Sequence, residues 1–191
     1  NLLNLKFIIK MNSKTQGSYH GWDEVWKGEK DNNQLNSNFT REKPKTIYQF
    51  WQKAYAHDLL NLIHNKKYQN FCELGSGRGT TSMYLSDAGY NDITMVDLSE
   101  NGFKIAKNSF FKHGLKEPKF ILADVENTGL SSDSFDCLYN IGLLEHFEDP
   151  SKTLQEAYRL LRKGGMIFMP IVPKLPFKKS IISRIFFNPV S

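Results

Sequence analysis

Three glycines at alternate positions, Gly75, Gly77 and Gly79, follow the apolar segment 71–74 and precede a helical segment. Because glycine has no Cβ, the backbone at these positions can adopt positive φ and come within contact distance of a ligand. The free N–H groups at the start of the next helix would face that ligand. The spacing therefore predicts a loop that binds a nucleotide cofactor.

The glycine spacing also discriminates between cofactors. A dinucleotide fingerprint requires G-x-G-x-x-G, but its last position is Thr80 when counted from Gly75 and Ser82 when counted from Gly77. A phosphate-binding P-loop requires Gly-Lys-Ser/Thr, which does not follow these glycines. Both patterns are disfavoured, and for the loop alone an ordinary glycine-rich turn remains the alternative.

Acidic residues at the ends of two later strands suggest the same kind of ligand. Asp97 lies 18 residues after Gly79, at the end of the apolar segment 93–96. In a doubly wound nucleotide-binding fold an acid here accepts hydrogen bonds from both ribose hydroxyls. The alternative is a cap region for the helix that begins after Ser99. Asp124 directly follows the segment 119–123. Taken alone, it marks only the end of a strand.

Together these residues resemble the class I S-adenosylmethionine (AdoMet) methyltransferases, whose first motif is E/D-x-G-x-G-x-G. Glu73 holds the acidic position, which in that family lies near the methionine amino group. The run 140–147 is similar to the "LEH" segment of the small-molecule branch, which includes quinone-pathway enzymes. The run 159–165 is similar to the family's turn into the fifth strand. The resemblance covers roughly residues 71–170.

This resemblance implies AdoMet as the cofactor and methyl transfer to a small molecule, either apolar or similar to a quinone or lipid. In the family, the acid and the apolar residue after the third strand lie against adenine. The implied cofactor-binding residues are Glu73, Gly75, Ser76, Gly77, Gly79, Asp97, Leu98, Asp124, Val125, Asn140 and Ile141. An NAD(P)-dependent oxidoreductase and an AdoMet-binding protein without transfer activity are the alternatives.

Methyl transfer from a sulfonium requires a nucleophile held in line with the methyl group, so proximity supplies much of the rate. A general base is needed only if the acceptor arrives protonated. His146 is the candidate because the ordinary pKa of histidine lies near neutrality. Alternatively, Glu145 and His146 only begin the next loop. No metal site is predicted, since a third ligand would fall at Gly142.

Apolar segments alternate with helical ones in a rhythm typical of a doubly wound, Rossmann-like α/β fold, with a mostly parallel sheet and helices on both faces. The predicted strands are 71–74, 93–96, 119–123, 135–140 and 166–169, and the predicted helices are 46–65, 80–88, 100–113 and one that begins near 151. The buried stripe expected on the last helix is Leu154, Ala157, Tyr158 and Leu161.

A chain of 191 residues with 40% hydrophobic content can bury one substantial core. We assign residues 46–172 to the AdoMet-binding domain and 1–45 to a polar N-terminal arm, of which 1–10 are expected to be upstream sequence. One or two helical turns are predicted around 23–27. The aromatic residues of the arm are expected to dock either over the cofactor or against the outer sheet.

The net charge of +5 arises near the C-terminus, because residues 157–191 hold seven basic residues and no acidic one. The rest of the chain is therefore not basic. DNA or RNA amino-methyltransferases of this fold carry Asn/Asp-Pro-Pro-Tyr/Phe where this chain has 140–143, so methylation of a nucleic-acid base is disfavoured. Residues 173–187 have the pattern of a basic amphipathic helix, which would contact a membrane surface, cover an apolar acceptor or pack on the domain.

The two cysteines, Cys72 and Cys137, lie in predicted strands and are expected to be buried free thiols. Two cysteines without a secretory signal indicate a reducing compartment, so a cytoplasmic location is predicted. The family's sheet has seven strands in the order 3-2-1-4-5-7-6, and only five are assigned before Ser191. We therefore expect the C-terminal strands to be missing and the outer edge of the fifth strand to be unpaired.

Overall fold

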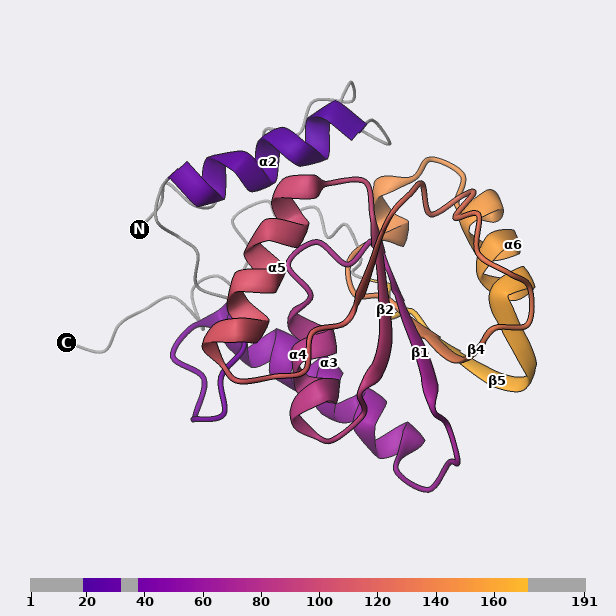
Figure 1. Ribbon diagram of the computed structural model, residues 1–191, viewed down its shortest axis with the longest axis horizontal. Coiled ribbons are helices and arrows are strands. Elements are labelled where there is room, and N and C mark those ends of the chain that lie inside the picture. Colours follow the sequence, from indigo (N-terminus) through magenta and orange to yellow (C-terminus); the bar gives the residue numbers. More distant parts are fainter. Residues whose placement is uncertain (1–18, 32–37, 172–191) are drawn as a thin grey trace, which may run out of the picture.

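The alternation of strands and helices folds into a five-stranded parallel sheet (Figure 1). The computed structural model describes residues 19–31 and 38–171. The strands are β1 (Asn70–Leu74), β2 (Asp92–Asp97), β3 (Lys119–Leu122), β4 (Phe135–Tyr139) and β5 (Leu161–Phe168). Their order in the sheet is β3-β2-β1-β4-β5. The predicted α/β fold is confirmed, while the predictions for 1–10 and 173–187 concern residues outside the described ranges.

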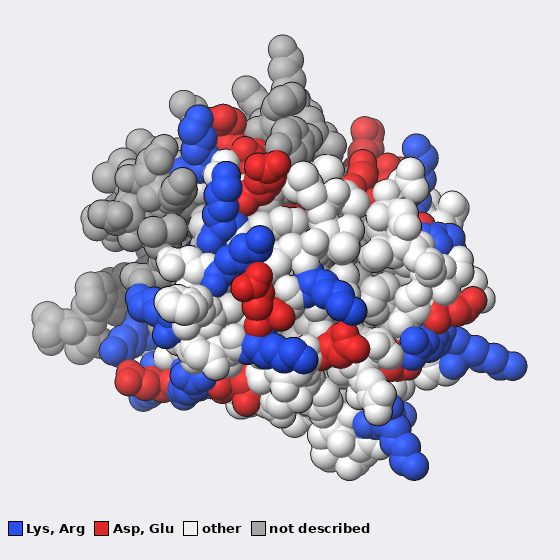
Figure 2. Space-filling model, in the orientation of Figure 1, with Lys and Arg blue, Asp and Glu red and all other residues white. Residues whose placement is uncertain are grey.

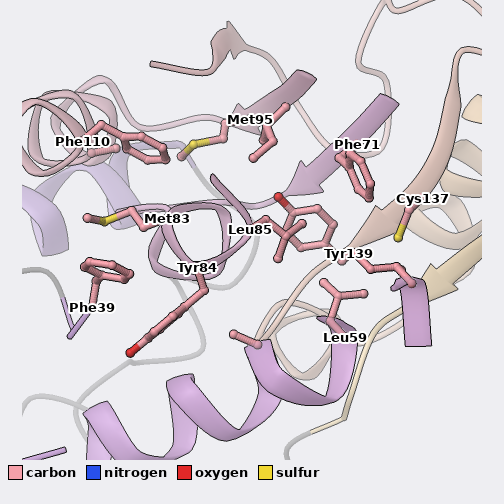
Figure 3. Close-up of a cluster of buried hydrophobic side chains, with 14 of the residues drawn as sticks. Phe39, Leu59, Phe71, Met83, Tyr84, Leu85, Met95, Phe110, Cys137 and Tyr139 are labelled. Atoms are coloured by element: carbon pink, nitrogen blue, oxygen red, sulfur yellow. The ribbon is translucent and has the colours of Figure 1, made fainter. Parts of the chain in front are cut away.

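Helices cover both faces of this sheet. They are α2 (Tyr19–Asp31), α3 (Ile47–Ile63), α4 (Thr80–Asp87), α5 (Glu100–Lys112) and α6 (Ser151–Leu160), with a short 3-10 helix η1 (Leu144–His146). On one face, Phe71 and Tyr139 pack with side chains of α3, α4 and α5 (Figure 3). On the other, Leu74 and Leu138 pack with α6. Because successive strand residues point to opposite faces, apolar residues are needed at neighbouring positions of a strand covered on both sides, as at Phe71 and Cys72 of β1 and at Cys137 and Leu138 of β4.

The same alternation separates the two cysteines. Cys72 packs on the α6 face and Cys137 on the face covered by α3, α4 and α5. Both are buried and free, as expected from the sequence.

The buried stripe of α6 agrees with the prediction at Ala157 but not at Leu154 and Tyr158. Leu154 is 41% exposed and Tyr158 is 78% exposed. The buried residues are Thr153, Glu156, Ala157 and Leu160. Glu156 accepts hydrogen bonds from Thr128 Oγ1 (2.6 Å) and from the Arg159 guanidinium (2.7 and 2.8 Å). These charge-assisted bonds allow a carboxylate to lie on the buried face, and they turn the helix away from the apolar stripe that the sequence indicated.

β5 also begins earlier than predicted, at Leu161 rather than 166. Phe135 pairs with Leu161 and Cys137 with Met166, so β5 has extra residues at this point. Gly165 lies against β4, where a Cβ would be 2.8 Å from the Asp136 carbonyl oxygen. Gly165, which suggested a turn in the sequence, instead lets the irregular strand β5 pass close to β4. Among the described residues, β5 pairs only with β4.

The polar arm contains a longer helix than predicted. α2 has 13 residues, whereas one or two turns were expected. It lies across the first turn of α5, beyond the end of the sheet where the strands terminate (Figure 1). The arm therefore packs near the carboxyl ends of the strands.

Candidate functional site

The residues predicted to form a site come from the ends of four strands that lie side by side. The glycine loop follows β1, Asp97 ends β2, Asp124 follows β3, and the segment 140–147 follows β4. Since the strands are parallel, the structure brings all these segments to one edge of the sheet. In open α/β sheets this edge is where ligands bind.

The glycine loop requires glycine for conformation and for space. Gly75, Gly77 and Gly79 have φ values of 63°, 50° and 66°. A Cβ at Gly75 would lie 2.7 Å from Leu143 Cδ1, and a Cβ at Gly79 would overlap the methyl group of Met95. Gly79 is thus needed by the core. Gly75 lets the segment after β4 approach the loop.

The space at Gly77 is filled from α2. A Cβ at Gly77 would lie 2.6 Å from Trp26 Cζ2. The Arg78 guanidinium carbon lies 5.0 Å from the centroid of the same indole, within the range of a cation–π contact. One turn earlier on α2, the Trp22 ring packs edge-on against His146, with centroids 4.7 Å apart. α2 therefore contacts both the glycine loop and the segment after β4.

Ser76 offers a polar atom to a ligand. Its N–H donates to the Val96 carbonyl at 3.0 Å, which ties the loop to β2. Its side chain is buried, at 8% exposure, and Oγ has no hydrogen-bond partner among the described residues. A buried hydroxyl without a partner costs about 1–3 kcal/mol. A polar group of a cofactor would remove that cost, so this residue fits the predicted ligand.

Asp97 is held by backbone donors. Its Oδ2 accepts from Gly77 N (2.7 Å) and its Oδ1 from Ser99 N (2.8 Å). Burial raises the pKa of Asp97, and these N–H groups oppose the shift by stabilising the ionised form. A carboxylate has about four acceptor positions, so two bonds leave capacity for the two hydroxyls of a ribose. The next residue, Leu98, is half-buried beside it.

Glu73 lies in a different environment. Its Oε2 accepts a hydrogen bond from Ser82 Oγ at 2.5 Å. Ser82 Oγ in turn lies 2.7 Å from the Tyr139 hydroxyl oxygen. Burial raises the pKa of Glu73 to about 8, so the carboxyl is largely protonated at neutral pH. The group is directed beneath the loop toward α4, and its contact with a methionine amino group stays a prediction. The sequence reasoning missed Ser82 and Tyr139, because Ser82 follows Thr80 and Thr81 and Tyr139 precedes Asn140, so neither stands out in the sequence.

The remaining predicted residues differ in accessibility. Asp124 is exposed and accepts from Glu126 N at 2.9 Å, while Val125 is buried behind it. Asn140 Nδ2 donates to the Leu74 carbonyl at 2.5 Å, which ties the end of β4 to β1. Ile141 is half-buried. Part of the Asn140 amide is thus used within the protein.

The segment after β4 contains η1, with Glu145 and His146. Glu145 Oε2 is buried and has no hydrogen-bond partner among the described residues. In the described ranges 19–31 and 38–171, no three His, Cys, Asp or Glu side chains gather to hold a metal ion. No helix within those ranges is both long and apolar enough to cross a bilayer.

Comparison with known proteins identifies the family. A family model described as "Methyltransferase domain" matches residues 72–169, just over half of the chain. The chain belongs to the class I S-adenosylmethionine-dependent methyltransferases. The matched range includes Glu73, the glycine loop, Asp97 and the segment after β4. This assignment decides against the NAD(P)-dependent oxidoreductase.

Similar proteins include two quinone-pathway enzymes. The chain is 30% identical over 104 residues to the chloroplastic 2-methyl-6-phytyl-1,4-hydroquinone methyltransferase 2 of Oryza sativa subsp. japonica (53% of this chain and 29% of that protein). It is 29% identical over 100 residues to the ubiquinone biosynthesis O-methyltransferase of Aromatoleum aromaticum (52% and 42%). The chain therefore matches less than half the length of either relative.

A solved structure shows the same fold with a reaction product bound. It is the phosphoethanolamine N-methyltransferase 2 of Haemonchus contortus in complex with S-adenosylhomocysteine. The TM-score is 0.55 at 21% identity, over 61% of this chain and 27% of that one. At this identity the likeness concerns the fold alone.

Proposed function

We propose that this chain binds AdoMet at the carboxyl edge of the sheet and serves methyl transfer to the hydroxyl of a hydroquinone-like or phenolic small molecule. The observation that carries the cofactor assignment is Asp97, whose carboxylate is fixed by two backbone N–H groups and retains capacity for two more donors. The unpartnered Ser76 Oγ supports it.

Bound AdoMet supplies a methyl group on a sulfonium centre. In this proposal Asp97 accepts hydrogen bonds from the ribose, Ser76 binds the methionine end, and Asp124 with Val125 lies against adenine. His146 would accept the proton of the acceptor hydroxyl; the methyl–sulfur bond would break as the oxygen–methyl bond forms, with S-adenosylhomocysteine as the leaving group. Trp22, packed against His146, helps to exclude water from that step.

The quinone-like acceptor class rests on the two relatives named for hydroquinone and ubiquinone chemistry, and transfer to oxygen rests on the second, which is named an O-methyltransferase. Charge supports a small molecule over a nucleic acid, because Lys and Arg are interspersed with Asp and Glu on the face in Figure 2. Proteins that bind a nucleic-acid backbone usually present a basic patch.

The cofactor proposal is tested by calorimetric titration with S-adenosylhomocysteine (AdoHcy) and with NAD. We expect binding of AdoHcy and none of NAD. Asp97→Ala should weaken AdoHcy binding by about 1–3 kcal/mol, the cost of unpaired buried hydroxyls. Asp92→Ala, at the opposite and exposed end of β2, is the control and should change nothing. Unchanged affinity in Asp97→Ala would refute the ribose assignment.

The acceptor proposal is tested by a screen with methyl-labelled AdoMet over hydroquinones, phenols and amines. Label transfer to hydroxyl oxygens is expected. Transfer to amines alone would contradict the acceptor class. AdoHcy binding without transfer to any acceptor would favour an AdoMet-binding protein that lacks transfer activity.

A further inference from the structure

The two backbone donors that hold Asp97 have a feature in common. Gly77 and Ser99 donate to the two oxygens of its carboxylate. Each of these donor residues is contacted by a side chain of α2: Trp26 packs on Gly77, and Asp23 bonds to Ser99. Residues three apart lie on the same face of a helix, so one face of α2 contacts both.

Asp23 acts at the first turn of α5. Its Oδ1 accepts from Ser99 Oγ (2.8 Å) and Asn101 N (3.1 Å), and its Oδ2 from Asn101 Nδ2 (2.8 Å). Ser99 Oγ in turn accepts from Gly102 N at 3.0 Å, so Ser99 caps α5. Asp23 therefore fixes the hydroxyl of the residue whose N–H holds Asp97.

Trp26 acts on the other donor. Its indole contacts the glycine loop at Gly77 and also lies beside Gly102, where a Cβ would be 3.4 Å from Cδ1. A Cβ at Gly102 would also lie 3.1 Å from the Gly77 carbonyl oxygen, so loop and helix are in close contact. A displaced Trp26 would leave the Gly77 N–H free to move with the loop.

We propose that Asp23 and Trp26 are positioning residues for the adenosyl cofactor, because together they hold the two N–H groups that aim the Asp97 carboxylate at the ribose. The proposal extends the proposed binding of AdoMet to the N-terminal arm. It states that α2 contributes to cofactor affinity through Asp97, without itself contacting the ribose.

Charge and position can be separated at Asp23. Its carboxylate is a like charge near Asp97 and contributes to the raised pKa of that residue. Asp23→Asn removes the charge but keeps an acceptor oxygen for Ser99. A positioning role therefore predicts AdoHcy affinity within about two-fold of wild type for Asp23→Asn, and a larger loss for Asp23→Ala.

The test is calorimetric titration of AdoHcy into the full chain and its variants. Asp23→Ala and Trp26→Ala should each weaken binding about 5- to 20-fold. Glu24→Ala, on the same helix with its carboxylate exposed beside Lys27, is the matched control and should stay within two-fold. Melting temperatures without ligand confirm that each variant is folded, and if Asp23→Ala is not folded, Trp26→Ala tests the same coupling.

The deciding measurement repeats both substitutions in an Asp97→Ala background. If α2 acts through Asp97, their effects on AdoHcy affinity should vanish there. Equal losses in both backgrounds would overturn the proposal, as would unchanged affinity of Asp23→Ala and Trp26→Ala in a protein that binds AdoHcy. A wild-type chain that fails to bind AdoHcy would instead refute the proposed function itself.

Discussion

The half of the site formed by β1 and β2 differs from the half formed by β4 in what holds its polar groups. Asp97 is fixed by backbone N–H groups at 2.7 and 2.8 Å. After β4, Glu145 Oε2 is buried without a partner among the described residues, and His146 contacts the ring of Trp22. Backbone geometry thus fixes Asp97 in the first half, whereas side chains surround His146 in the second. A fixed backbone arrangement suits a cofactor that is common to a family. Side-chain contacts suit an acceptor that varies from one family member to another.

The largest expected effect would separate the two halves by function. His146→Ala should lower the turnover of the acceptor found by the screen about 10²- to 10⁴-fold, the usual contribution of a general base. AdoHcy affinity should stay within two-fold, because the residue belongs to the β4 half. His57→Ala, on the exposed side of α3, is the control. Equal turnover of the His146 and His57 variants would remove the catalytic role.

The second prediction tests the backbone character of the first half. Gly77→Ala should cost about 1–2 kcal/mol for its positive φ and about 1–3 kcal/mol more for the clash with Trp26. Gly129 also has positive φ (70°) but open space around it, so Gly129→Ala should show only the first cost. Denaturant unfolding measures both. Equal losses of unfolding free energy in the two variants would mean that the Trp26 side chain moves aside with no measurable destabilisation.

The third prediction concerns the buried acid of β1. The folded chain holds a proton on Glu73 up to about pH 8, while the unfolded chain releases it near its ordinary pKa of 4.5. The free energy of unfolding should therefore fall as pH rises from 4.5 to 8, by up to about 1.4 kcal/mol per pH unit from this group. Glu73→Gln should flatten that slope, and Glu117→Gln, at an exposed site, should not. Parallel slopes in wild type and Glu73→Gln would contradict the assignment.

The smallest expected effect lies on α6, outside both halves of the site. Tyr158→Ala should change the free energy of unfolding by no more than about 0.5 kcal/mol, because the side chain is exposed. Leu160→Ala, at a fully buried position, should cost about 2–5 kcal/mol. Thermal melts of the two variants give the comparison. A large loss of stability in Tyr158→Ala would contradict the exposed position of this side chain and would support the stripe predicted from the sequence.

The sequence predicted the parts that depend on local requirements. Strand ends, the glycine loop and Asp97 follow from spacing and backbone conformation, and the structure brings them to one edge. The face of α6, the start of β5 and the Ser82–Tyr139 contact were missed. They depend on partners distant in the sequence, such as Thr128 for Glu156 and Asp136 for Gly165. The docking of α2 was foreseen only as one of two alternatives, since aromatic residues in a polar arm do not specify the surface that they contact.

Cys72 and Cys137 point to opposite faces of the sheet, so their alkylation can report the local opening of each face separately. The thiolate is the reactive form of cysteine, and burial raises the pKa of both thiols, that of Cys137 to about 12. An alkylating reagent should therefore modify either thiol only when the sheet is uncovered. Because each lies under a different layer of helices, the labelling rate of Cys72 should report the opening of the α6 face, and that of Cys137 the opening of the face covered by α3, α4 and α5.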